Sequence, residues 1–111
     1  MNEWQPLTES SYCILLALVT PNHGYGIMQD VEQFSNGSVQ VGAGTLYTAL
    51  SKFEKRGVIE RLPDQGRQKR YQLTEAGQML LQSEIERMAT LVKAGKRLTR
   101  QVSSANDEEQ T

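Results

Sequence analysis

Apolar residues recur at intervals of three and four positions in four segments of the chain, the spacing that places side chains on one face of an α-helix. The segments span residues 9–20, 22–35, 45–56 and 74–102. Thr8 and Thr74 stand where a side chain can cap the first and last segments, and Gly57 stands just past the end of the third. The pattern therefore predicts four helices, of which the last is by far the longest.

Between the helices, other segments have the composition of extended chain. Residues 38–41 (SVQV) alternate and are β-branched, so they can form one short strand. Residues 58–63 (VIERLP) and 68–73 (QKRYQL) flank the polar turn DQGR, which indicates a β-hairpin. This order of elements is that of a winged helix-turn-helix followed by a dimerisation helix. The expected fold class is mainly α (α+β), with the winged helix-turn-helix domain over residues 1–73.

The last predicted helix, residues 74–102, has an apolar stripe along its length. A chain of this size has too few other residues to bury the whole stripe. We therefore expect the stripe to pair with a second copy of the chain in a homodimer. The expected dimerisation residues are Leu81, Ile85, Met88, Leu91, Val92 and Leu98. Residues 103–111 are polar and acidic, and we expect them to form a disordered tail.

Composition narrows the class of protein. The 111 residues suffice for one small domain with an appended helix, and the net charge of −1 gives by itself no hint of nucleic acid. A single cysteine, Cys13, excludes an intramolecular disulfide and suits a reducing compartment. The longest apolar run, residues 14–19, is too short to span a membrane, and no basic flank of a signal peptide precedes it. The expectation is a soluble protein of the cytoplasm without a membrane partner.

The basic residues are distributed very unevenly. No Lys or Arg precedes Lys52, whereas seven of the twelve lie between residues 52 and 70, on the third predicted helix and the hairpin. Small hydroxyl and lysine side chains on the polar side of that helix can reach base edges and phosphates, and the hairpin can contact the DNA backbone or minor groove. The expected DNA-binding residues are Thr45, Tyr47, Thr48, Ser51, Lys52, Lys55, Arg67, Lys69 and Arg70.

Two alternatives remain open for this segment. A run of charges is, in most proteins, no more than a solvated surface. For Tyr47, a position beside the core and a contact with a phosphate are equally compatible with the sequence. The coincidence of the basic segment with a helix–hairpin unit favours a double-stranded DNA operator as the partner.

Three stretches resemble the PadR family of bacterial transcriptional regulators. They are HGYGIMQDVEQ (23–33), GAGTLYTALSKFEKRGVIE (42–60) and KRYQLTEAG (69–77). The resemblance implies a dimeric repressor on a pseudo-palindromic operator, similar to the smaller members with one C-terminal helix. It would place Thr45, Tyr47 and Thr48 at the groove and the lysines and wing residues on phosphates. The family usually has Pro where this chain has Ala43, which leaves the entry to the third helix looser.

The remaining chemistry does not indicate an enzyme, a metal site or a cofactor. His23 is the only histidine and has no ligands at metal-binding spacing, so we expect a polar turn residue. Cys13 lies among apolar residues and is expected to pack as a small hydrophobe rather than to sense oxidants. Trp4 is expected to pack, although it can also line a cavity between subunits.

Two rival functions differ in class from a repressor. One is a helical dimer that senses small molecules or drugs, with methionines such as Met79 in its binding surface. A small-molecule effector is also compatible with DNA binding. The other rival is a winged helix that binds protein through its third helix.

Overall fold

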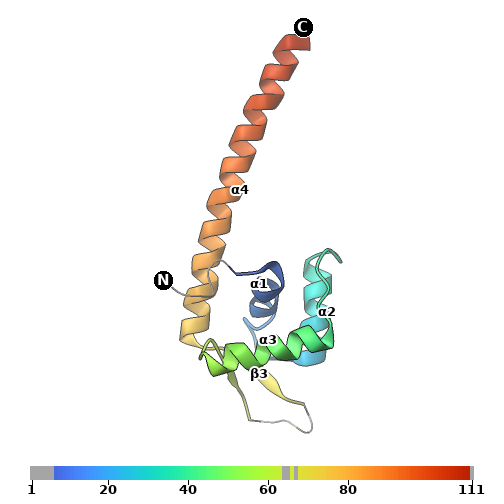
Figure 1. The fold of residues 1–111 in the computed structure, drawn as a ribbon, viewed down its shortest axis with the longest axis vertical. Helices are drawn as coiled ribbons and strands as arrows, with labels where there is room; N and C mark the ends of the chain where they lie inside the picture. The colour runs from blue at the N-terminus through green and yellow to red at the C-terminus, as the bar shows by residue number, and fades with distance from the viewer. Residues whose placement is uncertain (1–6, 64–65, 67, 111) are drawn as a thin grey trace.

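The computed structural model describes residues 7–63, 66 and 68–110, with side chains described as far as residue 102. The helices are α1 (Glu9–Leu16), α2 (Gly24–Phe34), α3 (Ala43–Lys55) and α4 (Glu75–Gln110), and the strands are β1 (Asn22–His23), β2 (Ile59–Arg61) and β3 (Arg70–Leu73). Three short helices and the sheet form a small body, from which α4 extends in one direction and the β2–β3 hairpin in the other (Figure 1). The molecule measures 67 × 31 × 21 Å because α4 runs far beyond that body.

The core fills the space between α1, α2, α3 and the sheet. Its largest fully buried side chains include Ile14 and Leu15 of α1, Ile27 of α2 and Phe53 of α3. The predicted cap of α1 is confirmed, since the Thr8 hydroxyl accepts a hydrogen bond from the Ser11 N–H at 3.1 Å. The winged helix-turn-helix fold predicted from the sequence is thus confirmed.

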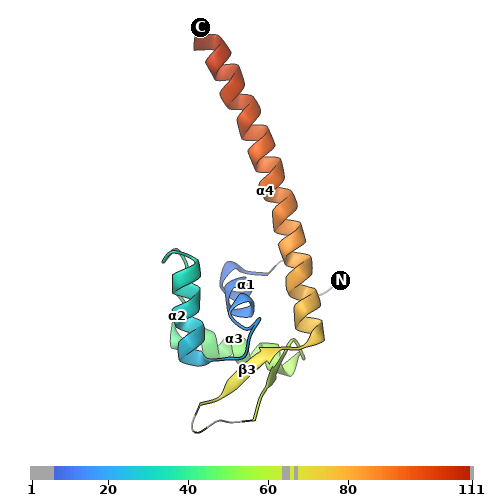
Figure 2. The ribbon, with the colours of Figure 1, turned by 180° about the vertical axis from the view of Figure 1, so that it is seen from behind.

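The sheet has three antiparallel strands in the order β1-β3-β2. The predicted hairpin is confirmed, with Ile59 opposite Leu73 and Arg61 opposite Tyr71. The third strand is β1 at residues 22–23, where the pattern predicts the start of a helix and His23 as a polar turn residue; the helix α2 begins instead at Gly24. Seen from behind, the sheet lies beneath the helical body and joins the lower end of α4, and the hairpin points in the direction opposite to the one in which α4 extends (Figure 2).

The prediction of a strand at residues 38–41 is wrong. Val39 and Val41 are buried and the residues between and before them are exposed, so the alternation in the sequence is real. None of the described strands pairs with this segment, however. The Ser35 side chain takes the place of one, accepting from the Val39 N–H at 3.1 Å and donating to its carbonyl at 3.2 Å.

A compact corner joins the end of α3 to the start of α4. Gly57 has φ +77°, and the Val58 N–H bonds the Phe53 carbonyl, as in helices that end on a left-handed residue. The Thr74 hydroxyl donates to the Gly57 carbonyl at 2.6 Å and accepts from the Gly77 N–H at 3.2 Å. The predicted roles of Gly57 and Thr74 are therefore confirmed, and together they fix the direction in which α4 leaves the domain.

Helix α4 packs its first turns on the domain and leaves the rest uncovered. Leu81 is 5 % exposed and belongs to the core of its own chain, so its assignment to a dimer interface is wrong. Ile85 and Met88 are half-buried, whereas Leu91, Val92 and Leu98 are more than half exposed. None of the described helices is long and apolar enough to cross a membrane.

The backbone of α4 continues as helix to Gln110, beyond the predicted end at residue 102. The expected disordered tail over residues 103–111 is therefore not what the structure has between residues 103 and 110. The segment contains Ala, Glu and Gln, which are good helix formers, and extending a started helix is easier than nucleating a new one.

Candidate nucleic-acid interface

Helix α3 has two chemically different sides. Leu46, Leu50 and Phe53 are at most 1 % exposed and attach the helix to the core. The exposed side has short hydroxyl groups near its N-terminus and amines near its C-terminus; its members are Thr45, Thr48, Ser51, Lys52 and Lys55. All five were expected to contact DNA, and the structure leaves all five accessible. A rigid helix with exposed short polar side chains has the shape and chemistry that the major groove admits.

The N-terminus of α3 differs from those of the other described helices. Thr8, His23 and Thr74 each accept a hydrogen bond from an amide in the first turn of α1, α2 and α4. Gly42, the N-cap of α3, makes no side-chain hydrogen bond. The amides of the first α3 turn are therefore open to an external acceptor. Ala43 occupies the first helical position, where the proline that the family usually has would fit.

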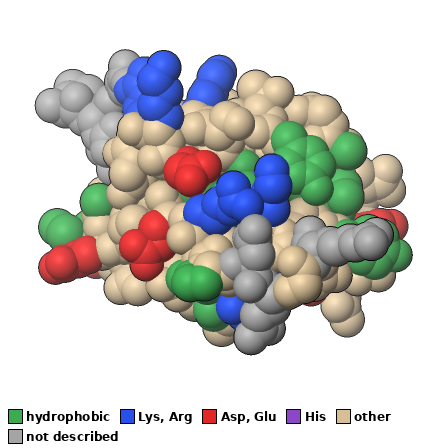
Figure 3. Space-filling view, turned by 90° about the horizontal axis from the view of Figure 1, so that it is seen from below, with side chains coloured by type: hydrophobic (Ala, Val, Ile, Leu, Met, Phe, Trp, Pro, Cys, Tyr) green, Lys and Arg blue, Asp and Glu red, His purple; other side chains and the backbone are tan. Residues whose placement is uncertain are grey.

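Basic and acidic side chains both lie on the exposed side of α3 and the neighbouring strand β2. Lys52 and Lys55 lie in the last turn of α3, where they also complement the negative end of the helix dipole. Glu54 and Glu60 are exposed nearby. Viewed from the side on which the hairpin projects, Lys and Arg side chains gather in two groups, with acidic side chains between and beside them (Figure 3). Basic side chains are therefore interspersed with acidic ones on this face.

The three wing residues that were expected to bind DNA are not equally accessible. Arg67 lies outside the described residues, so its expected role stays a prediction. Lys69 is exposed, whereas Arg70 is half-buried, and within the described chain its Nε atom is buried without a hydrogen-bond partner. Less of Arg70 than of Lys69 is therefore available to a ligand.

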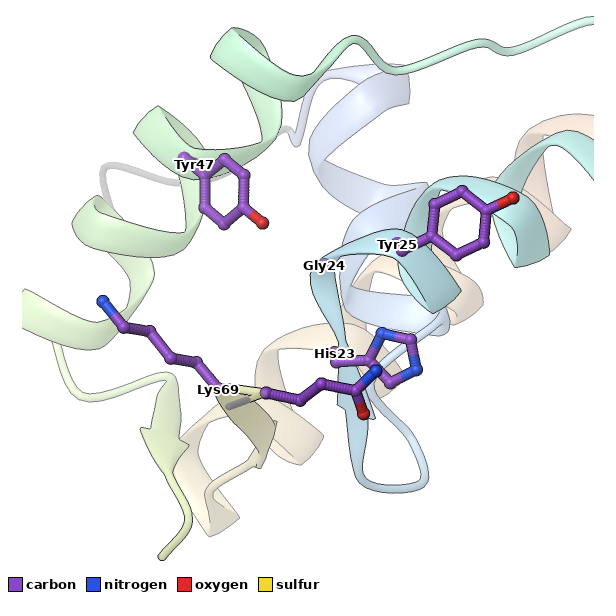
Figure 4. A pocket seen from close by; sticks show the side chains of 6 residues that line it. His23, Gly24, Tyr25, Tyr47 and Lys69 are labelled. Carbon is purple, nitrogen blue, oxygen red and sulfur yellow. The ribbon is translucent and has the colours of Figure 1, made fainter. Parts of the chain in front are cut away.

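A hollow of about 490 Å³ separates α3 from the start of α2 and from the wing. It is lined by His23, Gly24, Tyr25, Tyr47, Gln68 and Lys69. Tyr47 points from α3 toward the start of α2, and Lys69 extends from the wing toward α3 (Figure 4). Tyr47 is half exposed, so it flanks this hollow and is not a core residue.

Sequence reasoning missed the contribution of residues 23–25 to this hollow. Asn22 pairs with Tyr71 and His23 with Arg70, which brings the start of α2 beside the wing. The His23 Nδ1 atom accepts from the Gly26 N–H at 3.2 Å and so caps α2. The only sequence signal was the HGYG turn, and a two-residue strand is too short for a hydrophobic pattern to reveal.

The single cysteine has the environment of a packing residue. Burial, with a smaller effect of the nearby Glu9 charge, raises the pKa of the Cys13 thiol above its ordinary value of 9.0. A reactive cysteine requires the opposite, a lowered pKa and solvent access. Redox sensing at Cys13 is therefore disfavoured. Within the described chain, no group of three or more His, Cys, Asp or Glu side chains is placed to hold a metal ion.

Glu84 is a buried carboxylate that the sequence pattern did not single out. It is 0 % exposed, accepts from the Leu7 N–H at 3.0 Å and pairs with the Arg87 Nε atom at 2.7 Å. These bonds attach the chain that precedes α1 to α4. Since both partners are intramolecular, Glu84 has a structural role in the described part of the chain.

Comparison with known proteins gives relatives of similar sequence and similar fold. An uncharacterised 37.1 kDa protein of transposon TN4556 from Streptomyces fradiae is 38% identical over 84 residues, which make up 75% of this chain. The chain spans only 24% of that protein's length. RosR of H. salinarum in a complex structure (RosR-S1) shares 25% identity over 96% of both chains, with a TM-score of 0.68. A PadR-like transcriptional regulator of Bacillus cereus superposes with a TM-score of 0.70 at 19% identity, over 81% of this chain and 90% of that one.

The model of the transcriptional regulator PadR-like family matches residues 14–83. The match runs from α1 through the wing into the part of α4 that packs on the domain. It covers more than half of the chain and includes every element that forms the face described above. This chain belongs to the PadR-like family of transcriptional regulators.

Proposed function

We propose that this protein is a dimeric, sequence-specific DNA-binding repressor that reads the major groove with α3. The observation that carries the proposal is the two-sided character of α3. Leu46, Leu50 and Phe53 are fully buried, and the outward side has only small or cationic groups apart from Glu54 and Tyr47. A helix held this way can enter a groove without rearranging the core.

The two ends of α3 would have different roles. Thr45 and Thr48 lie in the first turns, whose hydroxyl groups can donate to or accept from base edges. Lys52 and Lys55 lie in the last turn and can reach the phosphates on the side of the groove. Base preference would therefore depend on the N-terminal half of the helix, and general DNA affinity on the C-terminal half.

The proposal includes a homodimer formed through the distal part of α4. Leu91 follows the buried Glu84 by seven residues, and Leu98 follows Leu91 by seven, so all three lie on one face of the helix. The face that packs on the core thus continues, uncovered, along the helix. A second α4 is the natural cover because it presents the same stripe.

Repression and its release would depend on the distance between two recognition helices. Successive major-groove faces are about 34 Å apart, so a dimer must hold two copies of α3 at that spacing. A small-molecule effector bound between subunits would release the DNA by tilting α4. Trp4 lies outside the described residues, and its fluorescence offers a probe for such a ligand.

The test is DNA binding by the purified protein over a series of salt concentrations. We expect log K to fall by about 0.9 per phosphate contact for each tenfold rise in salt. Lys52→Glu should abolish binding, whereas Lys93→Glu, on the exposed distal part of α4, should reduce it little. Binding without salt dependence, or equal loss in both variants, would contradict the proposal. A complex with another protein that survives Lys52→Glu would favour a protein-binding winged helix instead.

A further inference from the structure

The basic residues that precede α4 lie on α3, the hairpin and the corner between them, and all the others lie on α4. Seven of the twelve fall between residues 52 and 70, and the other five are Arg87, Lys93, Lys96, Arg97 and Arg100. Arg87 pairs with Glu84, whereas the last four are exposed, and among the described residues none of these four pairs with a carboxylate. We call these four the cationic face of α4.

The cationic face lies on one side of the helix. Arg100 follows Lys93 by seven residues, and the other two cations follow Lys93 by three and four, the spacing that places side chains on the same side. The exposed apolar residues Leu91 and Leu98 lie on the opposite side of α4. A second α4 that covers the apolar stripe therefore leaves the cationic face open to solvent.

This arrangement is unfavourable for the isolated helix. Like charges three or four residues apart repel one another, and the four cations form such pairs repeatedly. No Asp or Glu lies between residues 87 and 102 to turn that repulsion into attraction. The chain that follows continues as helix to Gln110, so it does not fold back over the face. An external anion is therefore needed to relieve the repulsion.

The position of the cationic face separates it from the α3 interface. Lys93 follows Glu75 by 18 residues, which is about 27 Å along the helix axis. Helix α4 carries the face away from the hairpin (Figure 1). Salt screens exposed charges beyond about 8 Å at physiological ionic strength. A duplex bound at α3 therefore neither contacts these cations nor gains from their field.

We propose that the cationic face binds the phosphate backbone of a second DNA duplex, so that one dimer joins two segments of DNA. The inference goes beyond the proposed reading of one operator and rests on it only for the first duplex. The face has no aromatic or large apolar residue, as the centre of a protein interface would require. A surface of evenly spaced charge, such as the DNA backbone, requires only cations.

Binding at this second site is independent of sequence and weak, because Lys and Arg on phosphates read no bases. Non-specific sites of this kind have dissociation constants of about 10⁻⁴–10⁻⁶ M at physiological salt, whereas specific sites reach about 10⁻⁸ M or lower. At the protein concentrations that measure operator binding, the cationic face is therefore empty. This is why substitutions there leave single-duplex binding nearly unchanged.

The experiment captures one duplex with another. A duplex selected by the wild-type protein from a random pool is fixed to beads and loaded with protein, and free protein is washed away. A labelled duplex of unrelated sequence is then added over a series of low salt concentrations. The wild type should retain the labelled duplex, and the variant Lys96→Gln with Arg100→Gln should retain less. The salt slope of this capture should fall by about 1.8 for each contacting protomer, since two phosphate contacts are lost.

The matched control keeps the charge and exchanges the side chains. Lys96→Arg with Arg100→Lys should capture the labelled duplex as the wild type does. Both double variants should bind the fixed duplex with wild-type affinity and remain dimers in sedimentation equilibrium. All four new residues are good helix formers at exposed positions, and circular dichroism checks that the variants fold.

Other results overturn the inference and leave the proposed function intact. If the wild type holds the fixed duplex and captures no labelled one, or if the glutamine variant captures as much as the wild type, the face binds no second duplex. Loss of the dimer in the glutamine variant would assign the face to subunit contacts. Retention of labelled polyglutamate but not of the duplex would assign it to an acidic protein. Failure of the wild type to bind the fixed duplex would instead remove the proposed function itself.

Discussion

The corner between α3 and α4 permits a stability prediction worked from the structure. Gly77 lies in the first turn of α4 directly against Val58, whose backbone forms the corner. A Cβ atom at Gly77 would overlap the Val58 carbonyl oxygen and lie 3.0 Å from its carbon and 3.2 Å from a methyl of Leu73. Non-bonded carbon atoms prefer separations of about 3.5–4.0 Å, so α4 would have to move outward by about half an ångström or more.

Gly77→Ala should therefore destabilise the protein. Overpacking costs about 1–3 kcal/mol, and the upper end applies here because the obstruction is backbone. The gain in helix propensity from Gly to Ala offsets about 1 kcal/mol. The net loss of about 2 kcal/mol should lower the melting temperature by about 10 °C. Because the same corner directs α4, we also expect the variant to lose more affinity for a two-site DNA duplex than for a half-site.

Gly44→Ala is the matched control. Gly44 is also in the first turn of a helix, but no atom lies within 4 Å of a Cβ added there. That variant should be as stable as the wild type or more stable, by up to about 1 kcal/mol. Thermal and urea unfolding followed by circular dichroism measures both. Equal effects of the two substitutions would refute the reasoning from the close approach at Val58.

Leu98→Asp should yield a folded monomer in sedimentation equilibrium, because a charge replaces an apolar group in the proposed α4 interface; a mass equal to the wild-type dimer would contradict that interface. Glu84→Ala should cost about 1–3 kcal/mol in urea unfolding because the Leu7 N–H loses its partner, whereas a cost below the error of the measurement would show that this bond is unimportant. Burial raises the pKa of the Cys13 thiol in the folded protein, so as the pH rises the unfolded chain loses its thiol proton before the folded one does. The wild type should therefore lose stability above pH 9 relative to Cys13→Val. Parallel pH profiles of these two proteins would contradict that assignment.

The candidate interface was predicted in outline but not in detail. The exposed side of α3 followed from its periodicity, because residues such as Leu46 and Leu50 recur at helical spacing and leave Thr48 and Lys52 on the other side. The hollow beside Tyr47 could not be predicted. It depends on a two-residue strand pairing with the wing, a contact between positions nearly fifty residues apart that no local pattern records.

The sequence by itself determined the four helices, the hairpin, the caps at Thr8 and Thr74 and the left-handed end at Gly57, because each depends on neighbours within a few residues. It also determined that the basic residues begin at α3. Only the tertiary structure decided that Leu81 belongs to the core, that residues 38–41 pair with no strand, and that Tyr47 turns toward α2. The physical reason is that hydrophobic periodicity shows which side of an element seeks cover, whereas only packing decides which part of the molecule supplies it.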